Sequence, residues 1–192
     1  MVAALSSEDR RIKWVDQVHS NTTLRIGRSD ECGQPADAMV SKDSLALTIF
    51  VADCAPIALG TQSATMGALH CGWKGLRDGI IRSAHQTIRD IDHSQIFALI
   101  GPCIGPCCYE FSYDDLADIA LKLRCDPEEI AAFTQSGSLA LDLRKAIGVE
   151  LASLDIELSF EDKRCTSCVA GEFFSYRARG EAERMALIVE KL

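Results

Sequence analysis

The sequence predicts an α+β fold in a single domain over residues 1–192. Apolar runs of strand length are mixed with amphipathic helical segments, without the strict strand–helix–strand rhythm of a doubly wound parallel sheet. The chain has 47% hydrophobic and 25% charged residues, an ordinary globular composition for one large domain. No internal repeat, low-complexity stretch or Pro/Ser-rich linker divides it.

Three apolar runs in the first half predict strands. They are LALTIFV at 45–51, PIALG at 56–60 and TMGALH at 65–70, and the small polar residues TQSA between the last two suit a turn. A hairpin centred near Gln62 makes Cys54 and His70 equidistant from the turn. We therefore expect these two residues to be direct cross-strand neighbours with Cβ atoms roughly 5 Å apart.

The next segments predict a helix, a strand and an irregular loop. Residues 75–91 carry an apolar face at helical spacing, with His85 on the polar side and His93 beyond the helix, both interpreted as exposed histidines. The segment QIFALIG reads as a buried strand that enters the loop GPCIGPCCYEF, whose two Gly-Pro pairs require irregular backbone.

Helices and two strands are expected in the last third of the chain. Asp126 is the expected N-cap of one helix, with Pro127 at its first position and Glu129 completing a capping box. The helices are expected at about 113–124, 127–134 and 141–153, and the strands at IELSF and RMALIVEKL.

Three residues carry the strongest chemical pattern, namely His19, Cys54 and His70 in the segments WVDQVHS, FVADCAPI and GALHCGWKG. One thiolate and two imidazoles suit Zn²⁺ and, less selectively, Cu²⁺. Three protein ligands leave a fourth position for chemistry, either to activate water or to polarise a substrate atom. The spacing does not place His19, which lies outside the hairpin.

Two alternatives remain open at this site. A Cys54 thiolate activated by His70 is the arrangement of a covalent hydrolase, which needs neither a metal nor His19. Asp53 adjoins Cys54, and a break in the strand would let it act as a catalytic base or hold a ligand. A structural hydrogen-bonding role for Asp53 is the competing interpretation.

The net charge and the hydropathy of the chain disfavour some classes of function. The net charge of −8 disfavours non-specific binding to nucleic acid or an anionic membrane, although a local basic pocket for phosphate is compatible with it. No apolar stretch near 18 residues and no basic-then-apolar leader is visible, so we expect a soluble cytoplasmic protein. Candidates for the basic pocket are Arg164, Arg177, Arg179 and Arg184, with surface arginines as the simpler interpretation.

Nine cysteines in a cytosolic chain favour reduced thiols, ligands and small buried side chains over disulfides. Cys165 and Cys168 form a C-x-x-C, and Cys103, Cys107 and Cys108 lie in one loop. A structural four-cysteine zinc site joining the two groups is one interpretation. It is disfavoured, because only one of the two groups has the usual ligand spacing.

The chain resembles the YfiH-type family over nearly its whole length. Its members were first named laccase-domain or polyphenol-oxidase-like proteins and were later reassigned as purine nucleoside phosphorylases; the family is also linked to peptidoglycan editing. The segments that carry the resemblance are WVDQVHS, PADAMVS, VADCAPIAL, ALHCGWKGL, LIGPCIGPCCYEF, LDLRKA, DKRCT and FFSYRARG.

This resemblance implies a layered α/β/β/α architecture with mixed sheets and a zinc site made by His19, Cys54 and His70. It also implies phosphorolysis of adenosine, inosine, guanosine and methylthioadenosine, with adenosine deaminase activity. Eighteen residues precede His19, fewer than the family pattern has, so the N-terminus is short or incomplete. Ser20 replaces a usual glycine, and Lys74 replaces a usual arginine.

The leading hypothesis is a zinc-dependent enzyme acting on purine nucleosides and phosphate. Lys74 is the first candidate to bind phosphate, and Arg177 is the second. Trp14 and Trp73 are expected either to stack on the purine base or to pack in the hydrophobic core. A non-catalytic zinc scaffold is the second hypothesis, with Cys71 or Cys107 as the fourth ligand. The Cys-His hydrolase is the third, and copper oxidase chemistry is the weakest. A homodimer is one expected assembly of the chain.

Overall fold

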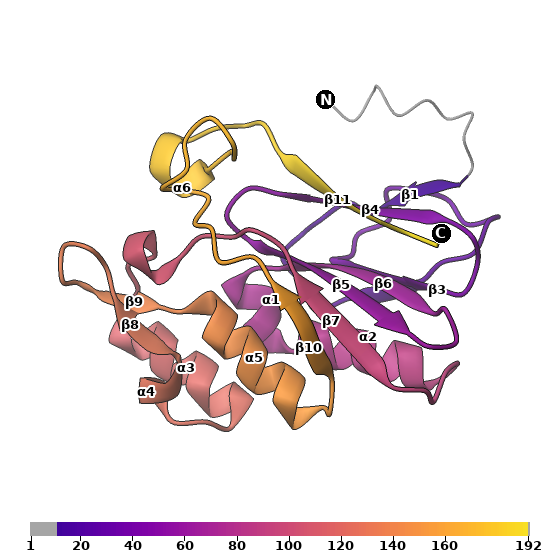
Figure 1. The fold of residues 1–192 in the computed structure, drawn as a ribbon, viewed down its shortest axis with the longest axis horizontal. Helices are drawn as coiled ribbons and strands as arrows, with labels where there is room; N and C mark the ends of the chain where they lie inside the picture. Colours follow the sequence, from indigo (N-terminus) through magenta and orange to yellow (C-terminus); the bar gives the residue numbers. More distant parts are fainter. Residues whose placement is uncertain (1–10, 192) are drawn as a thin grey trace.

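A computed structural model describes residues 11–191 of the chain, and its strands form a six-stranded, a three-stranded and a two-stranded sheet (Figure 1). The strand orders are β10-β7-β5-β6-β3-β2, β1-β4-β11 and β8-β9. The strands are β1 (Ile12–Trp14), β2 (Thr23–Arg25), β3 (Ala38–Ser41), β4 (Ala46–Val51), β5 (Ala55–Thr61), β6 (Met66–Cys71), β7 (Ile96–Ile100), β8 (Ala131–Phe133), β9 (Leu139–Leu141), β10 (Glu157–Glu161) and β11 (Met185–Glu190). The helices are α1 (Trp73–Asp78), α2 (Ile80–Arg89), the 3₁₀ turn η2 (Pro106–Cys108), α3 (Tyr113–Leu123), α4 (Pro127–Ile130), α5 (Leu143–Ser153) and α6 (Tyr176–Arg179).

The two larger sheets are mixed, which confirms the expected α+β class. In the six-stranded sheet β2 runs parallel to β3 and β10 parallel to β7, whereas β6 is antiparallel to both β3 and β5. In the three-stranded sheet β1 is parallel and β11 antiparallel to β4. Parallel and antiparallel neighbours in one sheet fit connections that are partly hairpins and partly longer crossovers.

The six-stranded sheet is covered on both faces over its central strands, whereas Leu99 of β7 and Leu158 and Phe160 of β10 are exposed. On one face its Met39 and Ala68 pack against Leu47 and Ile49 of the three-stranded sheet. The other face packs against α1, α2 and α5, and α3 and α4 pack on these helices (Figure 1). This second core holds both sheet and helix side chains. Within residues 11–191, one layer of helices and two layers of sheet are stacked, which are three of the four layers in the expected α/β/β/α architecture. No helix in the same range is long and apolar enough to span a bilayer.

The β5–β6 hairpin exists, but its expected register was wrong. Pro56, not Cys54, pairs with His70, and Cys54 lies just before the first residue of β5. The turn is therefore centred one residue later than Gln62. Cys54 and Pro56 are two apart, so Cys54 still projects to the same side of the sheet as His70, as its diagonal neighbour.

Two expected helices were too long. The segment 75–91 is split at Gly79, whose φ of 92° lies in the left-handed region, into α1 and α2. The helix expected at 127–134 ends at Ile130, and the chain continues extended into β8. The capping box of Asp126 and Glu129 with Pro127 at the first helical position is confirmed.

Candidate metal centre

His19, Cys54 and His70 converge at one end of the sheet sandwich, and their ligand atoms all lie within 4.8 Å of one another. His70 comes from β6, Cys54 from the β4–β5 connection and His19 from the loop after β1. The two imidazole rings meet edge to face with centroids 4.7 Å apart. The three residues chosen from the sequence therefore form one site.

The backbone around Cys54 brings its thiol to the histidines. β4 ends at Val51, and Asp53 adopts a left-handed φ of 78°, so the chain turns sharply before β5 begins. Gly72 faces the thiol, because a Cβ there would lie 2.8 Å from Sγ of Cys54. A side chain at position 72 would displace the sulfur, so glycine is required by close approach.

Asp37, directly before β3, fixes the orientation of His70. Nδ1 of His70 donates to Oδ1 of Asp37 at 2.8 Å, and both side chains are buried. A carboxylate on Nδ1 leaves Nε2 as the nitrogen free for a metal or a proton. Asp37 lies within the segment PADAMVS, and sequence reasoning gave it no role.

The same carboxylate holds the loop that carries His19. Asp37 accepts hydrogen bonds from the backbone N–H groups of Val18, His19 and Ser20, at 3.3, 3.0 and 2.6 Å. The hydroxyl of Ser20 donates to it as well, at 2.8 Å. His19 has a left-handed φ of 59°, which these bonds stabilise.

The electrostatics of the site favour a thiolate at Cys54. Burial opposes ionisation of this thiol, but hydrogen bonds from His19 and His70 outweigh burial and lower its pKa from 9.0 to about 7. Burial lowers the pKa of His70, yet the hydrogen bonds with Asp37 and Cys54 raise it overall from 6.5 to about 9. Without a metal the pair therefore tends toward thiolate and imidazolium.

Asp53 uses both carboxylate oxygens for structural contacts. Oδ1 accepts the hydroxyl of Thr166 at 2.6 Å, and Oδ2 accepts the backbone N–H of Arg177 at 2.7 Å. These bonds tie the turn beside Cys54 to the segment that carries α6. The side chain also borders the cavity described next.

A cavity of about 900 Å³ opens over His19, Cys54 and His70, and its volume is within the range of small-molecule sites. Five Trp, Tyr and Phe side chains line it, namely Trp14, Phe50, Trp73, Tyr109 and Tyr176. Lys74, Arg177 and Arg184 bring positive charge to the same walls. The cavity thus combines flat apolar surfaces with cations, as a ligand with a ring and an anionic group requires.

The cationic side chains that are candidates for phosphate binding differ in the contacts they make. The Lys74 ammonium lies 5.6 Å from the centre of the Trp73 ring, and the Arg177 guanidinium 5.1 Å from that of Tyr109. Arg184 donates to the backbone carbonyls of Glu181 and Glu183. Arg164 pairs with Asp162 and Glu172, and Arg179 with Glu181. Neither Arg164 nor Arg179 lines the cavity.

The remaining sequence candidates lie elsewhere. His93 is exposed as expected, but His85 is only half-exposed and accepts a hydrogen bond from Arg89 on α2. Cys71 follows His70 on β6 and so points to the opposite face, where it is buried in the helix-side core. Cys107 belongs to a separate group of cysteines.

The donor set fits a catalytic metal better than a closed structural one. Within residues 11–191, no fourth His, Cys, Asp or Glu atom joins the three ligands at comparable distance. The two fourth ligands expected for a closed site, Cys71 and Cys107, are directed away as described above. Three soft donors beside an open cavity are the pattern of a zinc site that keeps one position for a ligand.

A family model described as "Multi-copper polyphenol oxidoreductase laccase" matches residues 1–191 of the chain. The chain is 34% identical to purine nucleoside phosphorylase YlmD of Geobacillus stearothermophilus, over 92% of the chain and 72% of that protein. It is 31% identical to purine nucleoside phosphorylase Cgl2154/cg2365 of Corynebacterium glutamicum, over 93% of the chain and 74% of that protein.

Solved structures of similar proteins have the same fold as this chain. The crystal structure of YlmD from Geobacillus stearothermophilus superposes with a TM-score of 0.78 at 30% identity, covering 95% of this chain and 74% of the other. The crystal structure of Bacillus licheniformis hypothetical protein YfiH superposes with a TM-score of 0.83 at 25% identity, covering 98% and 78%.

Proposed function

Because the chain belongs to the laccase-type family of YlmD and YfiH, we propose that it is a zinc-dependent purine nucleoside phosphorylase. The observation that carries the proposal is the convergence of His19, Cys54 and His70 at the floor of a cavity with aromatic and cationic walls. Adenosine, inosine, guanosine and methylthioadenosine are the proposed substrates together with phosphate, and adenosine deaminase activity is the proposed companion.

The reaction transfers a glycosyl group from a base to phosphate. The bond between C1′ of the ribose and the purine nitrogen breaks, a bond from C1′ to a phosphate oxygen forms, and the departing purine takes up a proton. The chain must therefore align phosphate with C1′ and hold the base while charge moves onto it.

We assign phosphate binding to Lys74 and Arg177, which line the same cavity. The backbone N–H of Arg177 is held by Asp53, so Asp53 is proposed as the residue that positions this side of the cavity. Trp73 and Tyr109 carry the two cations over their rings, and the remaining aromatic surface suits stacking on a purine.

His19, Cys54 and His70 are the proposed zinc ligands. When bound, zinc supplies a Lewis acid that polarises a substrate atom or lowers the pKa of water. Asp37 keeps Nε2 of His70 available by accepting from Nδ1, and it holds the His19 loop in its strained conformation. Cu²⁺ can compete at such a site, since affinity rises toward copper along the first-row series.

Oxidase chemistry has little support in the residues despite the name of the family model. Reduction of oxygen to water takes four electrons, which laccases supply from several histidine-rich copper sites. The whole chain has four histidines, and His85 and His93 lie outside the site. One mononuclear Cys-His-His site is a poor match to that chemistry.

A cysteine hydrolase is the second candidate, because one observation favours it. Cys54, His70 and Asp37 form the chain of nucleophile, base and orienting carboxylate that covalent hydrolases use. Such an enzyme could act on an amide, as peptidoglycan precursor editing would require. The two functions differ at His19, which a metal site needs and a hydrolase does not.

We place the enzyme in the cytoplasm, because all nine cysteines are unpaired by disulfides, as expected of a reducing compartment. The net charge of −8 supports small-molecule substrates over nucleic acid or membrane partners. Whether the chain acts as a homodimer stays a prediction.

The proposal is tested by product identification. The purified, zinc-loaded protein is incubated with inosine and, separately, adenosine, with and without phosphate, and the products are identified by mass. Hypoxanthine and ribose 1-phosphate formed from inosine only when phosphate is present support phosphorolysis. Turnover of neither nucleoside under any metal loading would reject the proposal, and cleavage independent of phosphate would indicate a hydrolase.

A further inference from the structure

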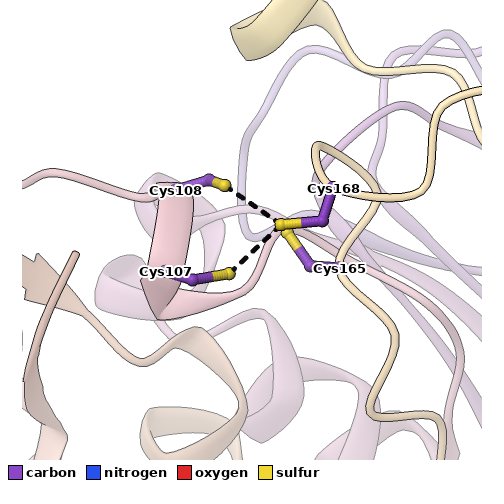
Figure 2. Close-up of side chains that lie close together, drawn as sticks. All are labelled: Cys107, Cys108, Cys165 and Cys168. Carbon is purple, nitrogen blue, oxygen red and sulfur yellow. Dashed lines mark hydrogen bonds between the residues drawn. The ribbon is translucent and has the colours of Figure 1, made fainter. Parts of the chain in front are cut away.

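Four cysteines form a second cluster outside the cavity (Figure 2). Cys107 and Cys108 belong to η2, and Cys165 and Cys168 to the loop that follows β10. The two pairs are about 60 residues apart in sequence, yet Figure 2 shows their side chains directed toward one another from the two segments. Cys103, in the same sequence group, is not a member of the cluster.

The four sulfur atoms of the cluster lie close to one another. Sγ of Cys168 lies 3.4 Å from that of Cys108 and 3.5 Å from that of Cys107, and all four sulfurs lie within 4.8 Å of one another. Four thiolates around zinc at about 2.3 Å would have sulfurs about 3.8 Å apart. A disulfide instead joins two sulfurs at about 2.05 Å and leaves the other two outside the bond.

The backbone around the cluster is packed as a ligand site requires. The N–H of Gly105 donates to Sγ of Cys165 at 3.1 Å, the kind of bond that stabilises a thiolate. A Cβ on Gly105 would lie 3.1 Å from Cβ of Cys165 and 3.2 Å from Sγ of Cys107. The loop therefore approaches the sulfurs as closely as a residue without a side chain allows.

The two segments are also joined next to the cluster. Cys103 and Cys165 form a parallel β-bridge, and the N–H of Thr166 donates to the Cys103 carbonyl at 3.2 Å. The buried Arg144, which is paired with Glu161, donates to the carbonyls of Cys103 and Arg164. These two hydrogen bonds hold together the two segments that carry the cysteines.

We propose that Cys107, Cys108, Cys165 and Cys168 bind a structural zinc ion. Tetrahedral four-sulfur coordination is the preference of zinc, and a site with four protein ligands is closed to chemistry. This second metal site is separate from the His19 site and goes beyond the proposed function. The sequence disfavoured it because Cys107 and Cys108 are adjacent, a spacing that only the tight turn of η2 makes compatible with one ion.

The four-cysteine cluster is connected to the cavity through the hydrogen bonds of Asp53. Cys165 is followed by Thr166, whose hydroxyl holds Asp53 beside Cys54. Asp53 in turn holds the backbone of Arg177. The ion therefore secures the segment that closes one side of the cavity, and its loss is expected to loosen that segment while leaving the His19 ligands in place.

The test uses the full chain with the first site removed. His19→Ala protein is compared with the double variants His19→Ala/Cys168→Ser and His19→Ala/Cys125→Ser, all purified with reductant and with zinc or cobalt supplied. Cys168 is exposed, so its replacement spares the core, and the half-buried Cys125 lies outside the cluster as the matched control. The readouts are metal per chain, the visible and near-ultraviolet spectrum of the cobalt form, and X-ray absorption of the zinc form.

The proposal requires about one metal ion per chain in His19→Ala and in the Cys125 control, and a large loss in the Cys168 variant. Cobalt should show strong sulfur-to-metal charge-transfer bands, and zinc a sulfur-only shell near 2.3 Å. Absence of retained metal in a folded His19→Ala protein overturns the proposal. A disulfide within the cluster under reductant, or nitrogen and oxygen ligands in the absorption data, also overturns it. None of these outcomes bears on phosphorolysis by the wild-type protein.

Discussion

Oδ1 of Asp37 lies 2.8 Å from Nδ1 of His70, and the same carboxylate accepts the backbone N–H of His19. One buried side chain therefore orients two of the three proposed metal ligands, although it contacts no ligand atom that would face the metal. Burial opposes ionisation of Asp37, but its hydrogen bonds with His70 and Ser20 outweigh this and keep its pKa below the ordinary value.

Replacing Asp37 should weaken metal binding without removing a ligand. Asp37→Asn keeps the size of the side chain but loses the charge that pairs with His70, so zinc affinity is expected to fall by about 10- to 100-fold. Competition with a chelator measures the affinity. Asp90→Asn, at an exposed carboxylate on the far end of α2, is the matched control. Equal affinity in the wild type and Asp37→Asn would contradict the role assigned to this carboxylate.

Gly72→Ala should disturb the site sterically. The added methyl group would lie 2.8 Å from Sγ of Cys54, so the thiol must move and zinc occupancy is expected to drop. Gly60→Ala, where nothing lies within 4 Å of the new methyl, should leave occupancy unchanged. Metal analysis after dialysis against a fixed zinc concentration compares the two. Wild-type occupancy in Gly72→Ala would show that the close approach is unimportant.

The thiol of Cys54 should react at unusually low pH in metal-free protein. Its pKa of about 7 means that alkylation rises as pH increases through 7, instead of through the ordinary value of 9.0. His19→Ala removes a hydrogen bond to the thiolate, so its midpoint should move upward. Peptide mass spectrometry follows Cys54, with the half-buried Cys125 as an internal reference whose pKa is raised. A midpoint at or above 9 in the wild type would refute the proposed thiolate stabilisation.

Lys74→Ala should mainly affect phosphate. Loss of a charged hydrogen bond of about 1.5–3 kcal/mol raises KM for phosphate by about 10-fold or more, with a smaller change in KM for inosine. Steady-state kinetics at varied phosphate separate the two effects. Lys145→Ala, on α5 away from the cavity, is the control. An effect of Lys74→Ala on inosine alone would reassign this side chain to nucleoside binding.

Gly148→Ala should stabilise the fold. Gly148 lies inside α5, and a Cβ there meets nothing within 4 Å. Alanine is therefore expected to raise the free energy of unfolding by about 1 kcal/mol through helix propensity alone. Urea unfolding followed by circular dichroism measures the change. A destabilised variant would mean that α5 is constrained in a way that its contacts do not reveal.

Long apolar runs were predictable because their pattern is local. β4, β5, β6 and β7 were all expected near their observed bounds, as was α3. The three-residue strands β1 and β2 were not foreseen, since too few residues carry a period and their pairing depends on distant partners. The single long helix expected over α1 and α2 failed at Gly79, where a left-handed φ outweighs continuous apolar spacing.

The convergence of the three proposed metal ligands could be anticipated because ligand chemistry depends on residue type, whereas the residues that support them depend on the fold. The expected register of Cys54 and His70 was wrong by one residue at the turn, and the two residues still meet because both remain on one face. Asp37 could not be identified from spacing, since its contacts with His70 and with the His19 loop arise only when β3 lies beside β6 and that loop folds over it.

The central claim is that inosine phosphorolysis depends on the metal held by His19, Cys54 and His70. The most direct measurement is the phosphate-dependent rate of hypoxanthine release as zinc is titrated into metal-free wild type, His19→Ala and the control His85→Ala. The account predicts a rate that rises with occupancy in the wild type and His85→Ala, and loss of both metal and rate in His19→Ala. Full phosphorolysis by His19→Ala, or by metal-free wild type, would contradict it.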